Sequence, residues 1–118
     1  MKCKLTPELS SGDWKDFCSR FHFASTDLPH IQAIYTALLP LVECYAYYSL
    51  DQDLDEVSLS HYAYGFVTLG TGLDELSELY LNHEQIQEAY IVDCISLVLL
   101  SKAYEAFAHV VENQTNLH

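Results

Sequence analysis

The sequence predicts an α+β fold, in which a small, mainly antiparallel sheet is packed by helices and a long buried helix lies near the C-terminus. Two runs of β-branched and aromatic residues, at about 42–49 and 62–69, have no helical periodicity and are typical of strands. Apolar residues at helical spacing come before and after these runs. The stretch from Ala89 to Leu100 is apolar almost all round, which is typical of a helix at the centre of a core.

Residues 1–25 are predicted to form an N-terminal helical segment with two candidate helix starts. Thr6 before Pro7 has the pattern of an N-cap followed by proline at the first helical position. Ser11 can cap a second turn, whose apolar residues share one face: Trp14, Phe17, Cys18 and Phe21. Trp14 is interpreted as an anchor that packs this segment onto the rest of the domain, in preference to a ligand-stacking role.

Residues 26–112 are predicted to form the core of the domain. A helix is expected from Thr26 or Asp27 to Pro40, and its apolar face is formed by Leu28, Ile31, Ile34, Tyr35, Leu38 and Leu39. The two strands follow, joined by the acidic turn DQDLDE, and Gly65 in the second strand indicates a bulge or a close backbone approach. The tyrosines of both strands predict an aromatic sheet: Tyr45, Tyr47, Tyr48, Tyr62 and Tyr64. This pattern is either cross-strand pairing or a flat face for a planar ligand or a partner protein.

The length and composition suit one domain over residues 1–118, and the net charge excludes several classes of partner. A net charge of −12 repels nucleic acid and anionic membrane, so neither is expected as a partner. The four cysteines form no CxxC pair and have no close histidine, so no metal site is predicted. The longest apolar run is too short to span a bilayer. No signal peptide is visible, so we expect a cytoplasmic location.

The stretch FVTLGTGLDE, residues 66–75, has the order of strand, glycine turn and helix that phosphate-binding loops use. It has no Gly-Lys-Ser/Thr, and Glu75 occupies the third glycine position of GxGxxG. The acids behind the turn compete with a bound phosphate, and Thr71 with Asp74 resembles a capping box. A capped strand-to-helix corner is therefore favoured over an anion site. The residues of the corner are retained as structural or site candidates: Thr68, Gly70, Thr71 and Gly72.

Asp93 is a further candidate, because it interrupts the most apolar part of a helix expected over roughly 85–112. A buried carboxylate needs hydrogen-bond donors. We favour a structural tie to the free N–H groups of the turn at 70–72 over a role as general base or cofactor ligand. Gly70 or Gly72 is expected to adopt a backbone conformation barred to larger residues. No catalytic residue is assigned, and a ligand site is expected beside this turn or across the tyrosine sheet.

The order of these pieces resembles the activation-domain family of vitamin B12-dependent methionine synthase. The resemblance covers about residues 26–112. It rests on four pieces of sequence: Thr68-Leu69-Gly70, the acidic helix Leu73 to Leu81, Tyr90 to Ser96 with Asp93, and Lys102 to Glu112 with Glu105-Ala106-Phe107.

The resemblance implies an accessory role in cobalamin-dependent methyl transfer, within a methionine synthase or methyltransferase system and not as a stand-alone enzyme. S-adenosylmethionine or cobalamin is the implied cofactor, and a corrinoid protein or methyltransferase subunit is the implied partner. The family's Arg-x-x-x-Gly-Tyr signature is absent: Arg20, the only arginine, is followed by Ala24-Ser25 at the Gly-Tyr positions. No S-adenosylmethionine-binding residue is therefore assigned. The alternative is a non-catalytic interaction or oligomerisation module that kept the fold, with a second copy of the chain as its partner.

Overall fold

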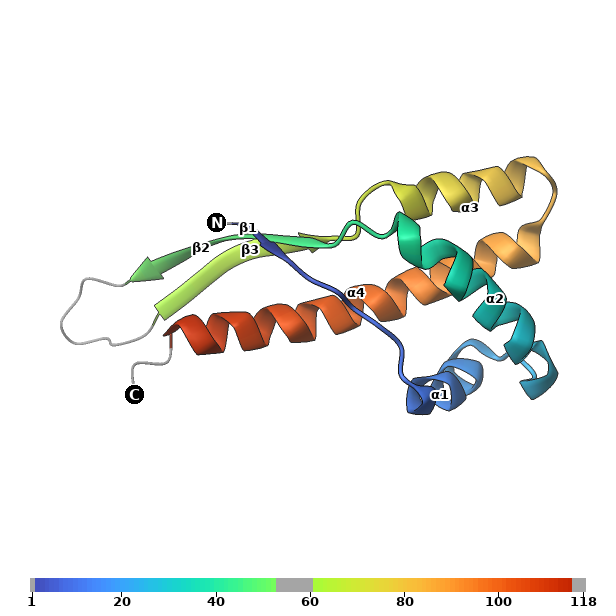
Figure 1. Ribbon diagram of the computed structural model, residues 1–118, viewed down its shortest axis with the longest axis horizontal. Coiled ribbons are helices and arrows are strands. Elements are labelled where there is room, and N and C mark those ends of the chain that lie inside the picture. Colours follow the sequence, from blue (N-terminus) through green and yellow to red (C-terminus); the bar gives the residue numbers. More distant parts are fainter. Residues whose placement is uncertain (1, 53–60, 116–118) are drawn as a thin grey trace.

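The computed structural model describes the backbone of residues 2–52 and 61–115, and the side chains of residues 2–48 and 65–112. It confirms the predicted α+β class. A three-stranded antiparallel sheet in the order β1-β2-β3 lies along the C-terminal half of a long helix, and three shorter helices gather at the other end of that helix (Figure 1). The elements are β1 (Lys2–Lys4), α1 (Ser11–Phe21), α2 (Leu28–Leu38), β2 (Tyr45–Gln52), β3 (His61–Thr68), α3 (Gly72–Asn82) and α4 (Ile86–Thr115). Short 3₁₀ turns at Ser25–Asp27 and Leu39–Leu41 flank α2.

The N-terminal segment differs from the sequence prediction, because residues 5–10 are extended and no helix begins at Thr6. Leu5, Pro7 and Leu9 are buried while the residues between them are exposed, which is the alternation of an extended chain lying on a core. The N–H of Leu9 donates to the Tyr35 hydroxyl at 3.0 Å. Pro7 therefore fills a core position in a strand-like connection and does not start a helix.

Helix α1 is anchored at its first turn. The carboxylate of Asp13 accepts hydrogen bonds from the Ser10 N–H at 2.6 Å and the Ser10 hydroxyl at 2.9 Å. The same side chain pairs with Lys102 of α4 at 3.0 Å. The Ser10 backbone bond, together with Lys102, lowers the pKa of Asp13 below its usual value. This pair holds the N-terminal helix against the long C-terminal one.

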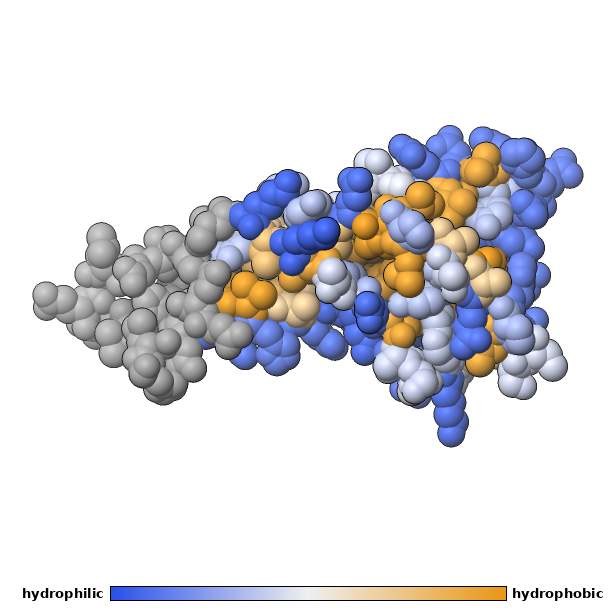
Figure 2. Space-filling model, in the orientation of Figure 1, coloured by the Kyte–Doolittle hydropathy of each residue, from blue (hydrophilic) through white to orange (hydrophobic). Residues whose placement is uncertain are grey.

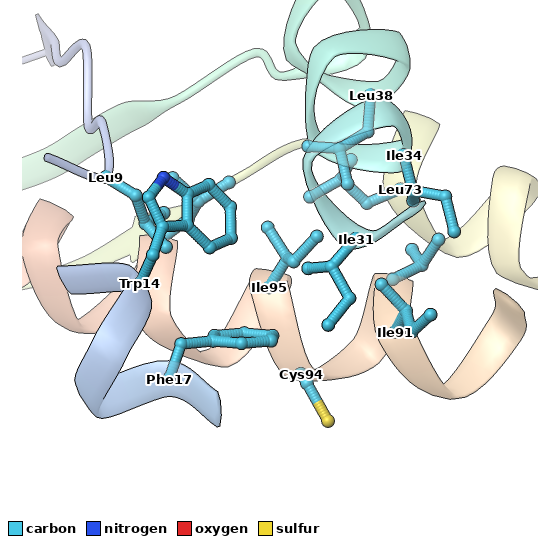
Figure 3. Packing of buried hydrophobic residues seen from close by; sticks show 12 residues of the cluster. Leu9, Trp14, Phe17, Ile31, Ile34, Leu38, Leu73, Ile91, Cys94 and Ile95 are labelled. Atoms are coloured by element: carbon cyan, nitrogen blue, oxygen red, sulfur yellow. The ribbon is translucent and has the colours of Figure 1, made fainter. Parts of the chain in front are cut away.

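The core consists of two adjoining clusters along α4. The larger one lies among the four helices, and Figure 3 shows its side chains converging on α4: Leu9, Trp14, Phe17, Ile31, Ile34, Leu38, Leu73, Ile91, Val92, Cys94, Ile95 and Leu99. Trp14 is 7% exposed, and its ring lies 5.0 Å from that of Tyr35, so it acts as the predicted anchor. The smaller cluster lies between the sheet and the C-terminal half of α4: Leu5, Cys44, Ala46, Tyr48, Val67 and Ala103.

Helix α4 is the central element, but one of its sides stays open. Ile91, Val92, Ile95, Leu99 and Ala103 are fully buried. The open side carries four large exposed residues: Ile86, Tyr90, Leu97 and Tyr104. On the face seen in Figure 2, hydrophobic residues gather in the middle, and hydrophilic residues lie mostly along the edges and at the helical end of the molecule. In the described part of the chain, no helix has both the length and the apolar content that crossing a membrane requires.

Candidate functional site

The corner between β3 and α3 depends on both of its glycines. Gly70 has a φ of +83°, which is the left-handed conformation that the sequence predicted for one of them. A Cβ atom on Gly72 would lie 2.7 Å from the backbone oxygen of Leu41. Gly70 is therefore needed for the turn itself, and Gly72 is needed so that α3 can start against the chain that leads into β2.

Hydrogen bonds close the corner, but not in the predicted capping pattern. The N–H of Gly70 donates to Thr68 Oγ1 at 3.1 Å, and the Leu69 carbonyl accepts from the Glu43 N–H at 3.0 Å. The predicted pair of Thr71 with Asp74 is wrong, since the Thr71 hydroxyl contacts the Glu75 carboxylate at 3.5 Å and makes no side-chain cap. Thr71 has helical φ and ψ angles of −98° and −11°, whereas a residue that caps through its side chain typically has extended angles, which accounts for the missing cap.

Asp93 is exposed, and the expectation of a buried carboxylate tied to the turn's N–H groups is wrong in that respect. Its Oδ1 accepts a hydrogen bond from the Ser77 hydroxyl of α3 at 3.0 Å. The reason is the orientation of α4, which turns Asp93 toward α3 and solvent while its neighbours Val92 and Ile95 face the core. Asp93 still lies near the turn, because it and Gly70 line the same hollow.

This hollow, which we call the corner hollow, lies between the β3–α3 corner and the middle of α4 and has a volume of about 490 Å³. Most of its lining is apolar: Val67, Leu69, Leu73, Leu97 and Leu100. The polar lining consists of Thr68, Gly70, Asp74, Asp93 and Ser96. Of the predicted site candidates, Thr68, Gly70 and Asp93 therefore meet at one site, whereas Thr71 and Gly72 shape the corner without lining the hollow.

The electrostatic character of the corner hollow is negative. Asp74 and Asp93 are its charged groups, and within residues 2–48 and 65–112 neither forms an ion pair. Ser96 uses its hydroxyl proton on the Val92 carbonyl at 2.7 Å, so its oxygen remains as an acceptor. A ligand with an apolar body and a positively charged group suits this combination of lining and charge.

The buried cysteines Cys44 and Cys94 do not line the corner hollow. Burial raises the pKa of the Cys44 and Cys94 thiols, which keeps both protonated at neutral pH and poorly nucleophilic. Among the side chains that the structure describes, no three His, Cys, Asp or Glu residues come together in a group able to hold a metal ion.

The tyrosine sheet is divided between its two faces. Tyr48 is 7% exposed and packs on Phe107 of α4 with ring centroids 5.2 Å apart, whereas Tyr45 and Tyr47 lie on the opposite face. The side chains of Tyr62 and Tyr64 lie outside the described residues. A second hollow of about 470 Å³, the sheet-face hollow, lies on the face of Tyr45 and Tyr47. Thr68 and Gly70 border both hollows, so one hollow lies beside the turn and the other across this sheet, and a ligand site at either place stays a prediction.

Sequence reasoning missed part of both hollows. On α4, Asp93, Ser96, Leu97 and Leu100 have the i, i+3, i+4, i+7 spacing of one helix face, which is a readable signal. The lining of the sheet-face hollow by Lys2 and Lys4 from β1, and the hydrogen bond from Ser77 of α3 to Asp93, depend on contacts between distant segments, for which the sequence has no local signal. Comparison with models of protein families and with curated proteins finds no match to this chain.

Proposed function

We propose that this chain is an accessory protein of cobalamin-dependent methyl transfer that binds S-adenosylmethionine in the corner hollow. One observation carries the proposal. The residues on which the resemblance rests, Thr68-Leu69-Gly70 of the corner and Asp93 with Ser96 of α4, come from separate segments and line a single hollow. A ligand site at this place explains why these residues from separate segments lie together, which core packing alone does not explain.

The chemistry of the corner hollow supports this ligand. S-adenosylmethionine carries a sulfonium and an ammonium group, and the carboxylates of Asp74 and Asp93 are suited to either. The apolar lining suits the adenine ring, and the volume of about 490 Å³ lies in the range of small-molecule sites. A cobalamin is too large to be enclosed there, so the corrinoid is supplied by a partner protein that docks near the hollow. Arg20 lies on α1 and does not line the hollow. Recognition of the ligand therefore depends on its cationic groups, which Asp74 and Asp93 attract.

Titration calorimetry with two matched ligands tests the proposal. S-adenosylhomocysteine lacks one methyl group and the sulfonium charge, so we expect it to bind more weakly than S-adenosylmethionine. Asp93→Asn is expected to lower the affinity for S-adenosylmethionine by about threefold to tenfold. The effect is moderate because solvent partly screens the charge contact that is lost. Glu78→Gln is the matched control, because Glu78 is exposed on α3 and does not line the hollow. Absence of heat with S-adenosylmethionine, or equal effects of the two substitutions, would contradict the proposal.

A second candidate function is that of an interaction module, and the open side of α4 favours it. Ile86, Tyr90, Leu97 and Tyr104 are 70%, 47%, 54% and 45% exposed and follow one another at intervals of four and seven residues. Such spacing forms an apolar stripe on one face of a helix, and the exposed Asp93 interrupts it. A stripe of this kind is typical of a surface that packs against another helix.

Sedimentation velocity over a range of concentrations tests the second candidate for the case of two copies of this chain. If the stripe joins two copies, the wild-type chain dimerises and Leu97→Glu shifts it to a monomer. Gln32→Glu adds the same charge at an exposed position of α2 and should leave the dimer unchanged. A wild-type chain that stays monomeric at high concentration rules out self-association through α4 and leaves S-adenosylmethionine binding as the better-supported function.

A further inference from the structure

The outer face of the sheet, turned away from α4, brings together aromatic and basic side chains. In the antiparallel register, Lys2 pairs with Tyr47 and Tyr47 with Phe66, while Lys4 pairs with Tyr45 and Tyr45 with Thr68. The alternating residues Cys3, Ala46 and Val67 pack toward α4 in the smaller core cluster. Because neighbouring residues of a strand point to opposite faces, the two rows lie on the outer face.

We call this surface the aromatic–lysine face and define it by Lys2, Lys4, Tyr45, Tyr47 and Phe66. The rings of Tyr47 and Phe66 stack with centroids 5.4 Å apart, and those of Tyr45 and Tyr47 lie 6.4 Å apart. Lys2 Nζ lies 4.2 Å from the ring centroid of Tyr45. Phe66 is 57% exposed and Tyr47 is 37% exposed, so this row of rings meets solvent. The sheet-face hollow opens beside it.

The charge of this face is opposite to that of the protein as a whole. The chain has only five lysine and arginine residues against 17 acids, yet two of the five lie on β1. Among the residues that line the sheet-face hollow, Glu43 is the one acid beside Lys2 and Lys4. Within the described side chains, neither lysine forms an ion pair, so both ammonium groups are open to an outside anion. Two basic groups beside exposed rings call for a ligand that is both anionic and aromatic.

We propose that the aromatic–lysine face binds a small anionic ligand with a planar ring, of the chemical class of a purine mononucleotide. The ring packs against Tyr47 and Phe66, as bases do on aromatic side chains, and Lys2 and Lys4 hold the phosphate. The sheet-face hollow, at about 470 Å³, is of the size of a small-molecule site. A nucleic acid strand is disfavoured, because a net charge of −12 repels a polyanion beyond the two lysines.

This site is independent of the proposed function. The corner hollow is lined by carboxylates and suits a cation, whereas the aromatic–lysine face presents ammonium groups and suits an anion. The two hollows share only Thr68 and Gly70 among their lining residues. Failure of S-adenosylmethionine to bind leaves this proposal intact, and the reverse is also true.

Three probes separate the contributions of the ring and the phosphate. Inosine 5′-monophosphate has both, inosine has the ring alone, and ribose 5-phosphate has the phosphate alone. Binding is followed by backbone amide NMR shifts of the full chain. We expect inosine 5′-monophosphate to bind most tightly, its shifts to map to β1, β2 and the end of β3, and its affinity to fall as salt is added.

Substitutions then test the contact with the ring and the contact with the phosphate separately. Phe66→Leu removes an exposed ring and is expected to lower the affinities for inosine 5′-monophosphate and for inosine alike, by about fivefold or more. The double variant Lys2→Gln/Lys4→Gln is expected to lower the affinity for inosine 5′-monophosphate by about threefold to tenfold and to leave the affinity for inosine unchanged. Lys15→Gln, which removes one exposed lysine from α1, controls for the loss of positive charge elsewhere on the surface. The proposal is overturned if Lys15→Gln has the same effect as the double variant, if the shifts map elsewhere, or if inosine 5′-monophosphate does not bind.

Discussion

Ile95→Ala is expected to lower the free energy of unfolding by about 2–5 kcal/mol. Ile95 is fully buried at the centre of the larger core cluster, where its side chain points from α4 toward Ile31 of α2 (Figure 3). Truncation removes buried apolar contacts and leaves a cavity that the surrounding helices can fill only in part. Urea unfolding followed by far-UV circular dichroism measures the loss.

Leu97→Ala is the control for this prediction, because Leu97 lies two residues further along the same helix and is 54% exposed. Its cost is expected to stay below about 1 kcal/mol. A cost for Leu97→Ala as large as that for Ile95→Ala would mean that the open side of α4 is covered in solution, which supports the interaction module. A negligible cost for Ile95→Ala would contradict the assigned orientation of α4.

The helices could be predicted because their signals are local. The i, i+3, i+7 spacing of Ile31, Ile34 and Leu38 marks the buried face of α2, and all three side chains are buried. Pro40 ends the regular helix as expected, since α2 stops at Leu38 and a 3₁₀ turn follows. These features depend on neighbours along the chain, which a single sequence shows directly.

Features that depend on distant segments could not be predicted. Strand β1 has only three residues, and its pairing with β2 joins Lys4 to Tyr45 across some 40 positions of sequence. Helix α4 is apolar on nearly every side, so its hydrophobic pattern does not show which side stays open. Asp93 was the one charged residue between Ala89 and Leu100 and marked the open side, but the prediction buried it and so gave it the wrong environment.

The candidate site likewise combines features that are local in sequence with features that depend on distant segments. The strand–turn–helix sequence predicts that Gly70 or Gly72 adopts a conformation barred to larger residues, and the structure shows that Gly70 is the one with a positive φ. The corner hollow requires α4 to pass beside β3 and α3, and its lining by Leu97 and Leu100 depends on that packing. The aromatic–lysine face depends in turn on β1, so only its tyrosines could be foreseen.

Gly70→Ala and Gly72→Ala are each expected to lower the free energy of unfolding by about 1–3 kcal/mol. At Gly70 the cause is the φ of +83°, which an L-residue adopts at a cost, and a new Cβ would also lie 3.1 Å from the Glu43 Cβ. At Gly72 the cause is steric, because the new Cβ would lie 2.7 Å from a backbone oxygen that cannot rotate away. Urea unfolding measures both.

Gly12→Ala is the matched control for the two corner substitutions. Gly12 lies in the first turn of α1, and a Cβ there would meet no atom within 4 Å. Alanine is the better helix former and restricts the unfolded chain, so this variant is expected to gain up to about 1 kcal/mol. Opposite signs at Gly12 and Gly70 would show that the corner requires glycine for its geometry, whereas a neutral Gly70→Ala would contradict it. Since Gly70 borders both hollows, its substitution should also weaken S-adenosylmethionine and inosine 5′-monophosphate together, whereas Asp93→Asn and the double lysine variant each act on one ligand.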